Sequence, residues 1–161
     1  MSNAIPADRI QLVEAAPKPF AALLRMEQSL DLPERLHNLV SLRASQINGC
    51  AFCLDMHWKD ARAAGETEER LYMLGAWRES PLYDERERAA LALCEAMTVI
   101  NEGHVPGEVW ERAKAVFDQP ELANLVFAIT AINSWNRLNI TARVEPGHYD
   151  PSQRAMLGRA A

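Results

Sequence analysis

The segment QINGCAFCLDMH, residues 46–57, is the stretch of this chain that decides how its fold is interpreted. An asparagine and Gly49 stand near its middle, and both residue types tolerate the left-handed conformation that ends a helix. One helix is therefore expected to stop at Gly49, and the next to start at Cys50. The segment thus predicts two helices in succession.

Helical periodicity dominates the rest of the chain, and no convincing run shows the alternation that marks a strand. Pro33 and Pro106 can each open a helix at its first turn. Asp84 is followed three residues later by Glu87, which is the spacing of a capping box. The predicted helices cover about residues 7–15, 19–30, 33–48, 50–65, 67–77, 85–100, 106–117 and 120–143. No linker divides the chain, so we predict an all-α helical bundle with a single domain over residues 1–161.

Composition and charge narrow the classes of protein to which the chain can belong. Hydrophobic residues make up 48% and charged residues 24%, as in ordinary globular proteins. The net charge of -5 gives no electrostatic reason to expect nucleic acid or an anionic membrane as partner. No segment approaches the roughly 20 apolar residues of a membrane span, and the N-terminus lacks a signal-peptide pattern. Three cysteines are too few for a disulfide scaffold, so we expect a cytoplasmic, reducing location.

The cysteine segment gathers three reactive side chains on one helix face. At about 100° per residue, Cys50, Cys53 and His57 share that face. Cys53 and His57 are also stacked one turn apart. Because Cys50 starts the helix, unpaired backbone amides and the helix dipole favour its thiolate. His57 can accept the proton of Cys53, so the local pattern predicts a reactive dithiol with a base beside it.

Two other interpretations of the segment remain open at this point. A zinc site needs four ligands, or three and a water, and three ligands from one helix face surround a tetrahedral ion poorly. The other histidines, His37, His104 and His148, show no ligand spacing. Free cysteines also fill hydrophobic cores, which is the interpretation we prefer for Cys94. For the cysteine pair a redox centre is favoured, with no metal and no cofactor predicted.

Three stretches of the chain resemble a known family. They are LVSLRASQINGCAFCLDMHWKDARAAGETEERL (39–71), ERERAALALCEAMT (85–98) and INSWNRLNITAR (132–143). Together they resemble the AhpD-like alkylhydroperoxidases of the carboxymuconolactone decarboxylase superfamily, over a core of about residues 36–143. The resemblance implies an all-helical fold that assembles into homotrimers or homohexamers. It also implies a peroxidase that reduces organic hydroperoxides and is recycled by a dithiol reductant, such as a lipoylated or thioredoxin-like protein.

The resemblance also implies a role for each residue of the dithiol site. Cys53 takes the position of the peroxidatic cysteine, Cys50 that of the resolving cysteine, and His57 that of a proton-relay residue. Attack on the O–O bond turns the Cys53 thiolate into a sulfenic acid, which then condenses with Cys50 to a disulfide. An external dithiol restores both thiols by exchange.

The chain departs from the family pattern at the proton relay. The family commonly has a glutamate twelve residues before the first cysteine, where this chain has Asn38. An asparagine can orient a water or a histidine but cannot deliver a proton. The neighbouring His37 points about 100° away and is expected at the surface or an interface. Carboxylates that could replace the missing one are Glu34, Glu87 and Glu95.

Several other residues are candidates for supporting roles. Gln46 is expected to bond to the backbone of the cysteine turn. Trp135 lies among the polar residues Asn133, Asn136 and Arg137 of an apolar helix, which either line an interface or reach the dithiol. The remaining tryptophans are interpreted as core or subunit contacts.

The sequence therefore predicts an enzyme, a thiol-dependent peroxidase. The first alternative is a thiol–disulfide oxidoreductase or redox sensor, which the missing relay glutamate motivates. The second is a non-catalytic helical oligomeric protein. Decarboxylation is not favoured, because that branch of the superfamily lacks the cysteine pair.

Overall fold

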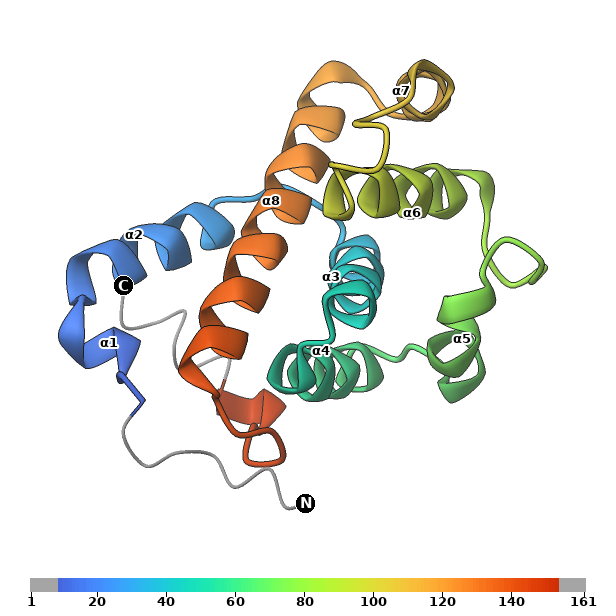
Figure 1. Cartoon of the computed structure of the whole chain (residues 1–161). Coiled ribbons are helices and arrows are strands. Elements are labelled where there is room, and N and C mark those ends of the chain that lie inside the picture. The colour runs from blue at the N-terminus through green and yellow to red at the C-terminus, as the bar shows by residue number, and fades with distance from the viewer. Residues whose placement is uncertain (1–8, 154–161) are drawn as a thin grey trace.

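The computed structural model describes residues 9–153, which contain helices and no strand (Figure 1). The α-helices are α1 (Leu12–Ala15), α2 (Pro17–Gln28), α3 (Glu34–Asn48), α4 (Ala51–Ala63), α5 (Glu68–Tyr72), α6 (Glu85–Thr98), α7 (Gly107–Val116) and α8 (Gln119–Ala142). Two short 3₁₀ turns are η1 (Met73–Ala76) and η2 (Pro151–Gln153). The all-α prediction is confirmed. The helix expected at 7–15 is shorter, since residues 9–11 precede α1 and residues 7 and 8 lie outside the described part.

Helix starts follow the capping residues of the sequence. Asp84 and Glu87 form the predicted capping box of α6, and Asp118 and Glu121 form a second one at α8. Pro33 and Pro106 are N-cap residues, so α3 and α7 begin one residue later than predicted.

The turn between α3 and α4 has the predicted form. Gly49 adopts a left-handed conformation, with φ of 71°, and ends α3. Cys50 has an extended backbone and is the N-cap residue of α4. A residue other than glycine rarely adopts this φ, so the sharp turn from α3 into α4 depends on Gly49.

Helix α3 is the centre of the bundle. It packs against α4, α6 and α8, and nine of its 15 residues are buried, which requires neighbours on more than one side. Figure 1 shows α8 running past α6, α3 and α4, with α2 beside it. None of the described helices combines the length and the apolarity that a bilayer span demands.

Two apolar clusters lie on the two sides of α3. One contains Val40, Leu93 and Ile129 together with all three cysteines of the chain. The other contains Leu39, Leu74 and Trp77. Cys94 belongs to the first cluster, where it is fully buried and burial raises its pKa to about 12. The prediction that Cys94 is a core residue is therefore confirmed.

A group of four charged side chains joins α3, α5 and α6. Arg70 is 2.9 Å from Glu66 and 2.6 Å from Glu87, and these three side chains are at most 8% exposed. Arg35 lies 3.2 Å from Glu66 and 3.1 Å from Glu87 and completes the group from the solvent side. Burial alone would lower the pKa of Arg70, but its bonds to Glu87 and Glu66 outweigh burial and raise it. The charges are thus compensated inside the fold.

Candidate active site

The two cysteines of the turn are in contact. The Sγ atoms of Cys50 and Cys53 are 2.6 Å apart, and both thiols are free. The backbone N–H of Cys53 donates to Cys50 Sγ over 3.4 Å, so the first sulfur caps the helix that carries the second. Cys50 and Cys53 are only 1% and 0% exposed. A negative charge on this pair is therefore stabilised by protein groups and not by bulk water. The predicted juxtaposition of the thiols is observed.

The hydrogen bond between the sulfurs makes one proton easy to lose and the other difficult. Donation from Cys53 is the main cause that lowers the pKa of Cys50 to about 7, against the opposing effect of burial. The same bond, with burial, raises the pKa of Cys53. Two thiolates in contact would repel each other, so the pair holds one negative charge near neutral pH. That charge rests on Cys50, at the helix N-terminus.

Asparagines of α8 approach the dithiol from the other side. The side-chain amide of Asn139 donates to Cys53 Sγ over 3.3 Å, which favours the Cys53 thiolate. Asn136 is fully buried and lowers the pKa of both thiols. It donates to Ser45 Oγ at 3.0 Å and accepts from Asn48 at 2.8 Å. This network fixes α8 against the end of α3, immediately behind the cysteine turn.

Two buried histidines lie on α3 and α4, His37 and His57. His57 is 3% exposed and lies one turn after Cys53. The ring of His37 meets it edge to face, with centroids 5.9 Å apart at 71°. His37 is itself only 8% exposed, so the expected surface or interface position is wrong. Its Nε2 lies 3.8 Å from Oε1 of Glu27, a residue of α2.

A pocket of about 510 Å³ opens beside the histidines. Its lining mixes leucines and a methionine with acidic and hydrogen-bonding groups. The lining residues are Leu24, Glu27, Gln28, Leu30, Leu32, Glu34, His37, Met56, His57, Asp60 and Tyr149. Tyr149 donates to Asp60 at 2.7 Å and so attaches the segment after α8 to α4. The pocket gives a small molecule or solvent access to the imidazole side of the site.

Comparisons with known proteins place the chain in a family. A sequence model of the carboxymuconolactone decarboxylase family matches residues 17–96, which include the cysteine turn. The uncharacterized protein YdfG of Bacillus subtilis (strain 168) is 41% identical over 137 residues, which cover 83% of this chain and 93% of YdfG. This chain belongs to the carboxymuconolactone decarboxylase family.

Solved structures of similar fold refine the family placement. ATU0492 of Agrobacterium tumefaciens, a protein of unknown function assigned provisionally as the antioxidant defence protein AhpD, is 40% identical with a TM-score of 0.83. The match covers 88% of this chain and 99% of ATU0492. The debrominase Bmp8 has a TM-score of 0.68 at 19% identity, over 89% of this chain and 75% of its own, and shows the fold alone. The chain is an AhpD-like member of the carboxymuconolactone decarboxylase family, as the sequence resemblance predicted.

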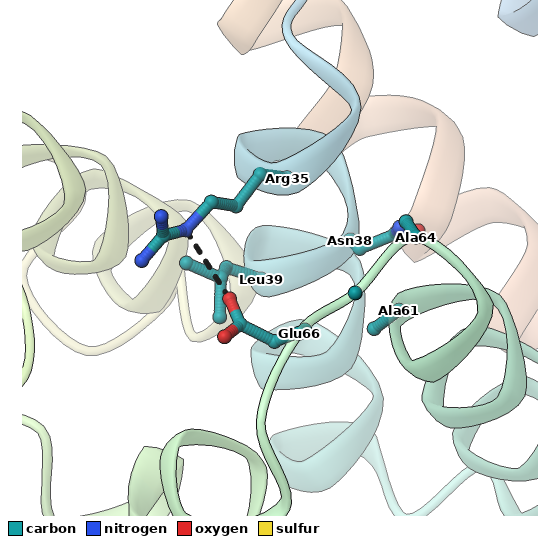
Figure 2. Close-up of a pocket in the computed structure, with 7 residues that line it drawn as sticks. Arg35, Asn38, Leu39, Ala61, Ala64 and Glu66 are labelled. Atoms are coloured by element: carbon teal, nitrogen blue, oxygen red, sulfur yellow. Dashed lines mark ion pairs between the residues drawn. The ribbon is translucent and has the colours of Figure 1, made fainter.

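Asn38, which stands where the sequence resemblance led us to expect a glutamate, faces a second and smaller pocket. Figure 2 shows this pocket between α3 and the end of α4, with the ion pair of Arg35 and Glu66 at its side. Its volume is about 110 Å³. Asn38 is 1% exposed, and within residues 9–153 neither its Nδ2 nor its Oδ1 has a hydrogen-bond partner. The family position is thus occupied by a neutral side chain with room beside it.

Two of the carboxylates proposed to replace the relay glutamate are engaged elsewhere. Glu87 caps α6 and pairs with Arg70. Glu95 lies 2.7 Å from Arg43 and accepts from the indole of Trp77 at 2.8 Å. Of the three predicted candidates, only Glu34 lines the pocket beside the histidines.

The supporting residues predicted from sequence have different positions. Gln46 accepts from Arg43 at 3.0 Å and makes no bond to the backbone of the cysteine turn within the described residues, so that expectation is wrong. Trp135 packs in the same cluster as both cysteines, and its indole donates to Glu27 Oε2 over 2.6 Å. Asn139 and Glu27 were not predicted. The spacing of Asn133, Asn136 and Asn139 along an apolar helix was a usable signal, whereas nothing local distinguishes Glu27.

No three histidine, cysteine, aspartate or glutamate side chains converge as a metal site anywhere in residues 9–153. The arrangement is that of a dithiol with neutral hydrogen-bond donors beside it, on a helix that also carries His57 into a pocket. Such a site can hold one negative charge on sulfur and exchange protons with a pocket.

Proposed function

We propose that this protein is a thiol-dependent peroxidase that reduces organic hydroperoxides through a cycle of the Cys50–Cys53 dithiol and disulfide. The observation that carries the proposal is the contact of two free, buried sulfurs at the start of a helix. Membership of the AhpD-like proteins supports it, as does the provisional antioxidant assignment of ATU0492.

The resting charge and the proposed nucleophile are on different sulfurs. The Cys50 thiolate accepts a hydrogen bond from Cys53, so moving that proton across the bond exposes a thiolate on Cys53. Asn139 donates to this sulfur and stabilises it there. The low-pKa thiol therefore acts first as a local base and later as the resolving group.

The reaction proceeds in three balanced steps. The Cys53 thiolate attacks the distal oxygen of the hydroperoxide, the O–O bond breaks, and an alkoxide leaves and takes a proton to become the alcohol. The Cys50 thiol attacks the sulfenic sulfur, and one water leaves with the thiol hydrogen and the sulfenic hydroxyl. A dithiol reductant, whose two thiols become a disulfide, returns the two electrons and two protons by exchange.

Turnover with candidate reductants tests the proposal. Consumption of an organic hydroperoxide is followed with a dihydrolipoyl protein and with a thioredoxin-like protein as donors. We expect saturable consumption that stops when the donor is exhausted. A rate no greater than that of the donor alone, with every donor, contradicts the proposal.

A second candidate function is a thiol–disulfide oxidoreductase or redox sensor. The neutral Asn38 favours it, because exchange between sulfurs needs less proton transfer than cleavage of a peroxide with release of an alkoxide. Fast exchange with small disulfides beside negligible peroxide consumption would identify this function.

Alkylation of the wild-type protein tests the ionisation of the pair. The pKa of Cys50 is lowered to about 7, so its thiolate is present above that pH and is lost by protonation below it. The rate of reaction with iodoacetamide should level off above about pH 8 and fall about tenfold per unit below pH 7. A midpoint near that of free cysteine, about 8.5, would show that the pair does not share its proton as proposed.

We further propose that the chain forms homo-oligomers, with trimers or hexamers as the expected states, and works in the cytoplasm. Phe127 and Ile140 on α8 and Val144 after it are 55%, 40% and 38% exposed, which leaves apolar surface for a second copy. Light scattering on the eluting protein should give three or six times the chain mass of 18.0 kDa. A monomeric mass would contradict this part of the account.

A further inference from the structure

A carboxylate of α2 lies beside the two histidines of the candidate site. Glu27 of α2 is 20% exposed at its side chain and lies between two partners. The indole of Trp135 donates to its Oε2 over 2.6 Å, and Nε2 of His37 lies 3.8 Å from its Oε1. The carboxylate is therefore oriented towards His37 by α8.

His37 connects this carboxylate to His57. Its ring meets that of His57 edge to face, at 5.9 Å between centroids. His57 lies one turn after Cys53 on the same helix. Glu27, His37 and His57 also line the same pocket, so a proton taken up by one imidazole can pass to solvent there.

We propose that Glu27, acting through His37, supplies the relay carboxylate that Asn38 cannot supply. Both are positioning residues, and His57 is the group next to the reacting thiol. In the step concerned, the proton of Cys53 passes to Cys50, and the imidazolium of His57 stabilises the thiolate that is left on Cys53. The negative charge of Glu27 compensates the imidazolium through His37. The proposal rests on the peroxidase function proposed above.

Other ionisable groups face the same space and must be separated from Glu27. Glu34 at the start of α3 and Asp60 on α4 line the pocket, and Tyr149 from the segment after α8 donates to Asp60. Glu34 is the matched comparison, because it is also a glutamate that lines this pocket but stands at the start of α3 instead of on α2.

The test is alkylation of Cys53 by iodoacetamide as a function of pH, in a Cys50→Ser background. This reaction reports the deprotonation of Cys53 whether or not a hydroperoxide is the substrate. Glu27→Gln should move the midpoint up by about one pH unit, because the thiolate–imidazolium pair loses its compensating charge. If Glu27 acted only as a nearby negative charge, its loss would make the Cys53 thiolate easier to form and would move the midpoint down. The direction of the shift therefore distinguishes a compensating carboxylate from a merely repulsive one. Glu34→Gln should move it down or not at all.

Two further variants connect the effect to the relay. Added to His37→Gln, Glu27→Gln should cause no further shift, because Glu27 acts through that histidine. Asn38→Glu should return the midpoint of Glu27→Gln towards its original value, and the pocket of about 110 Å³ beside Asn38 has room for the added methylene group. A role of Glu27 in folding alone would not be rescued from another helix.

The outcomes separate this inference from the proposed function. An unchanged or lowered midpoint in Glu27→Gln overturns the relay, and so does a folded double variant with Asn38→Glu that keeps the raised midpoint. Absence of peroxide turnover in wild type, with these midpoint shifts present, overturns the peroxidase and leaves the relay standing. Thermal melting of each variant checks that it is folded.

Discussion

Replacement of Cys53 by serine should reduce peroxide turnover to the uncatalysed level, a loss on the order of 10³-fold or more. The variant loses the sulfur on which the O–O bond is proposed to break, and serine has no thiolate to replace it. The measurement is the initial rate of hydroperoxide consumption with a dithiol donor in excess.

Cys50→Ser should give a different loss from Cys53→Ser. Its Cys53 can still react once with hydroperoxide, but no second thiol condenses with the sulfenic acid. One equivalent is consumed and a dimedone-like reagent labels Cys53. If instead Cys53→Ser keeps the single fast turnover and Cys50→Ser loses it, the nucleophile is Cys50, where the resting charge lies.

Cys94→Ala is the matched control for both cysteine variants. Cys94 is fully buried in the core, has a pKa raised to about 12 by burial, and donates to the carbonyl of Val40 at 3.3 Å. We expect turnover close to wild type with some loss of stability. A large loss of turnover at normal folding would assign Cys94 a role that this account does not contain.

Glu87→Ala should lower the free energy of unfolding by about 3–5 kcal/mol, because it leaves the buried Arg70 with one carboxylate fewer. It also removes the side chain that closes the capping box of α6. The measurement is urea unfolding followed by circular dichroism at neutral pH.

Two variants separate the contribution of the Glu87 charge from that of its capping of α6. Glu87→Gln keeps a side chain that can bond to the N-cap backbone, so its loss reports the buried charge. Glu121→Ala removes the corresponding residue of the capping box on α8, where the partner Arg86 is exposed. Its effect should be much smaller. Equal losses in Glu87→Ala and Glu121→Ala would contradict compensation of a buried charge.

The sequence predicts best what a few neighbouring residues determine. Gly49 ends α3 and Cys50 caps α4 because the backbone conformation and the capping sulfur are local properties. The box of Asp84 and Glu87 was found for the same reason. Asp118 and Glu121 have the same spacing, and this second box could have been predicted by the same rule.

The surroundings of the dithiol could not be predicted in this way. His37 was assigned to the surface from the angle of one helix, but its burial is decided by what packs on α3. Glu27 and Trp135 are 108 residues apart in sequence, and their hydrogen bond depends on how α2 lies against α8. A single sequence shows which residues share a face of a helix, but it does not show which other helix packs against that face.

The central claim is that hydroperoxide oxidises the Cys50–Cys53 pair to a disulfide. The most direct measurement is a count of free thiols in the unfolded protein after one equivalent of cumene hydroperoxide has been added to the fully reduced chain. We predict a fall from three free thiols to one per chain, since Cys94 stays reduced. The mass of the chain should fall by two hydrogens, and one equivalent of alcohol should form. The claim would be contradicted if all three thiols remained, or if the thiols of the chain were oxidised no faster than free cysteine.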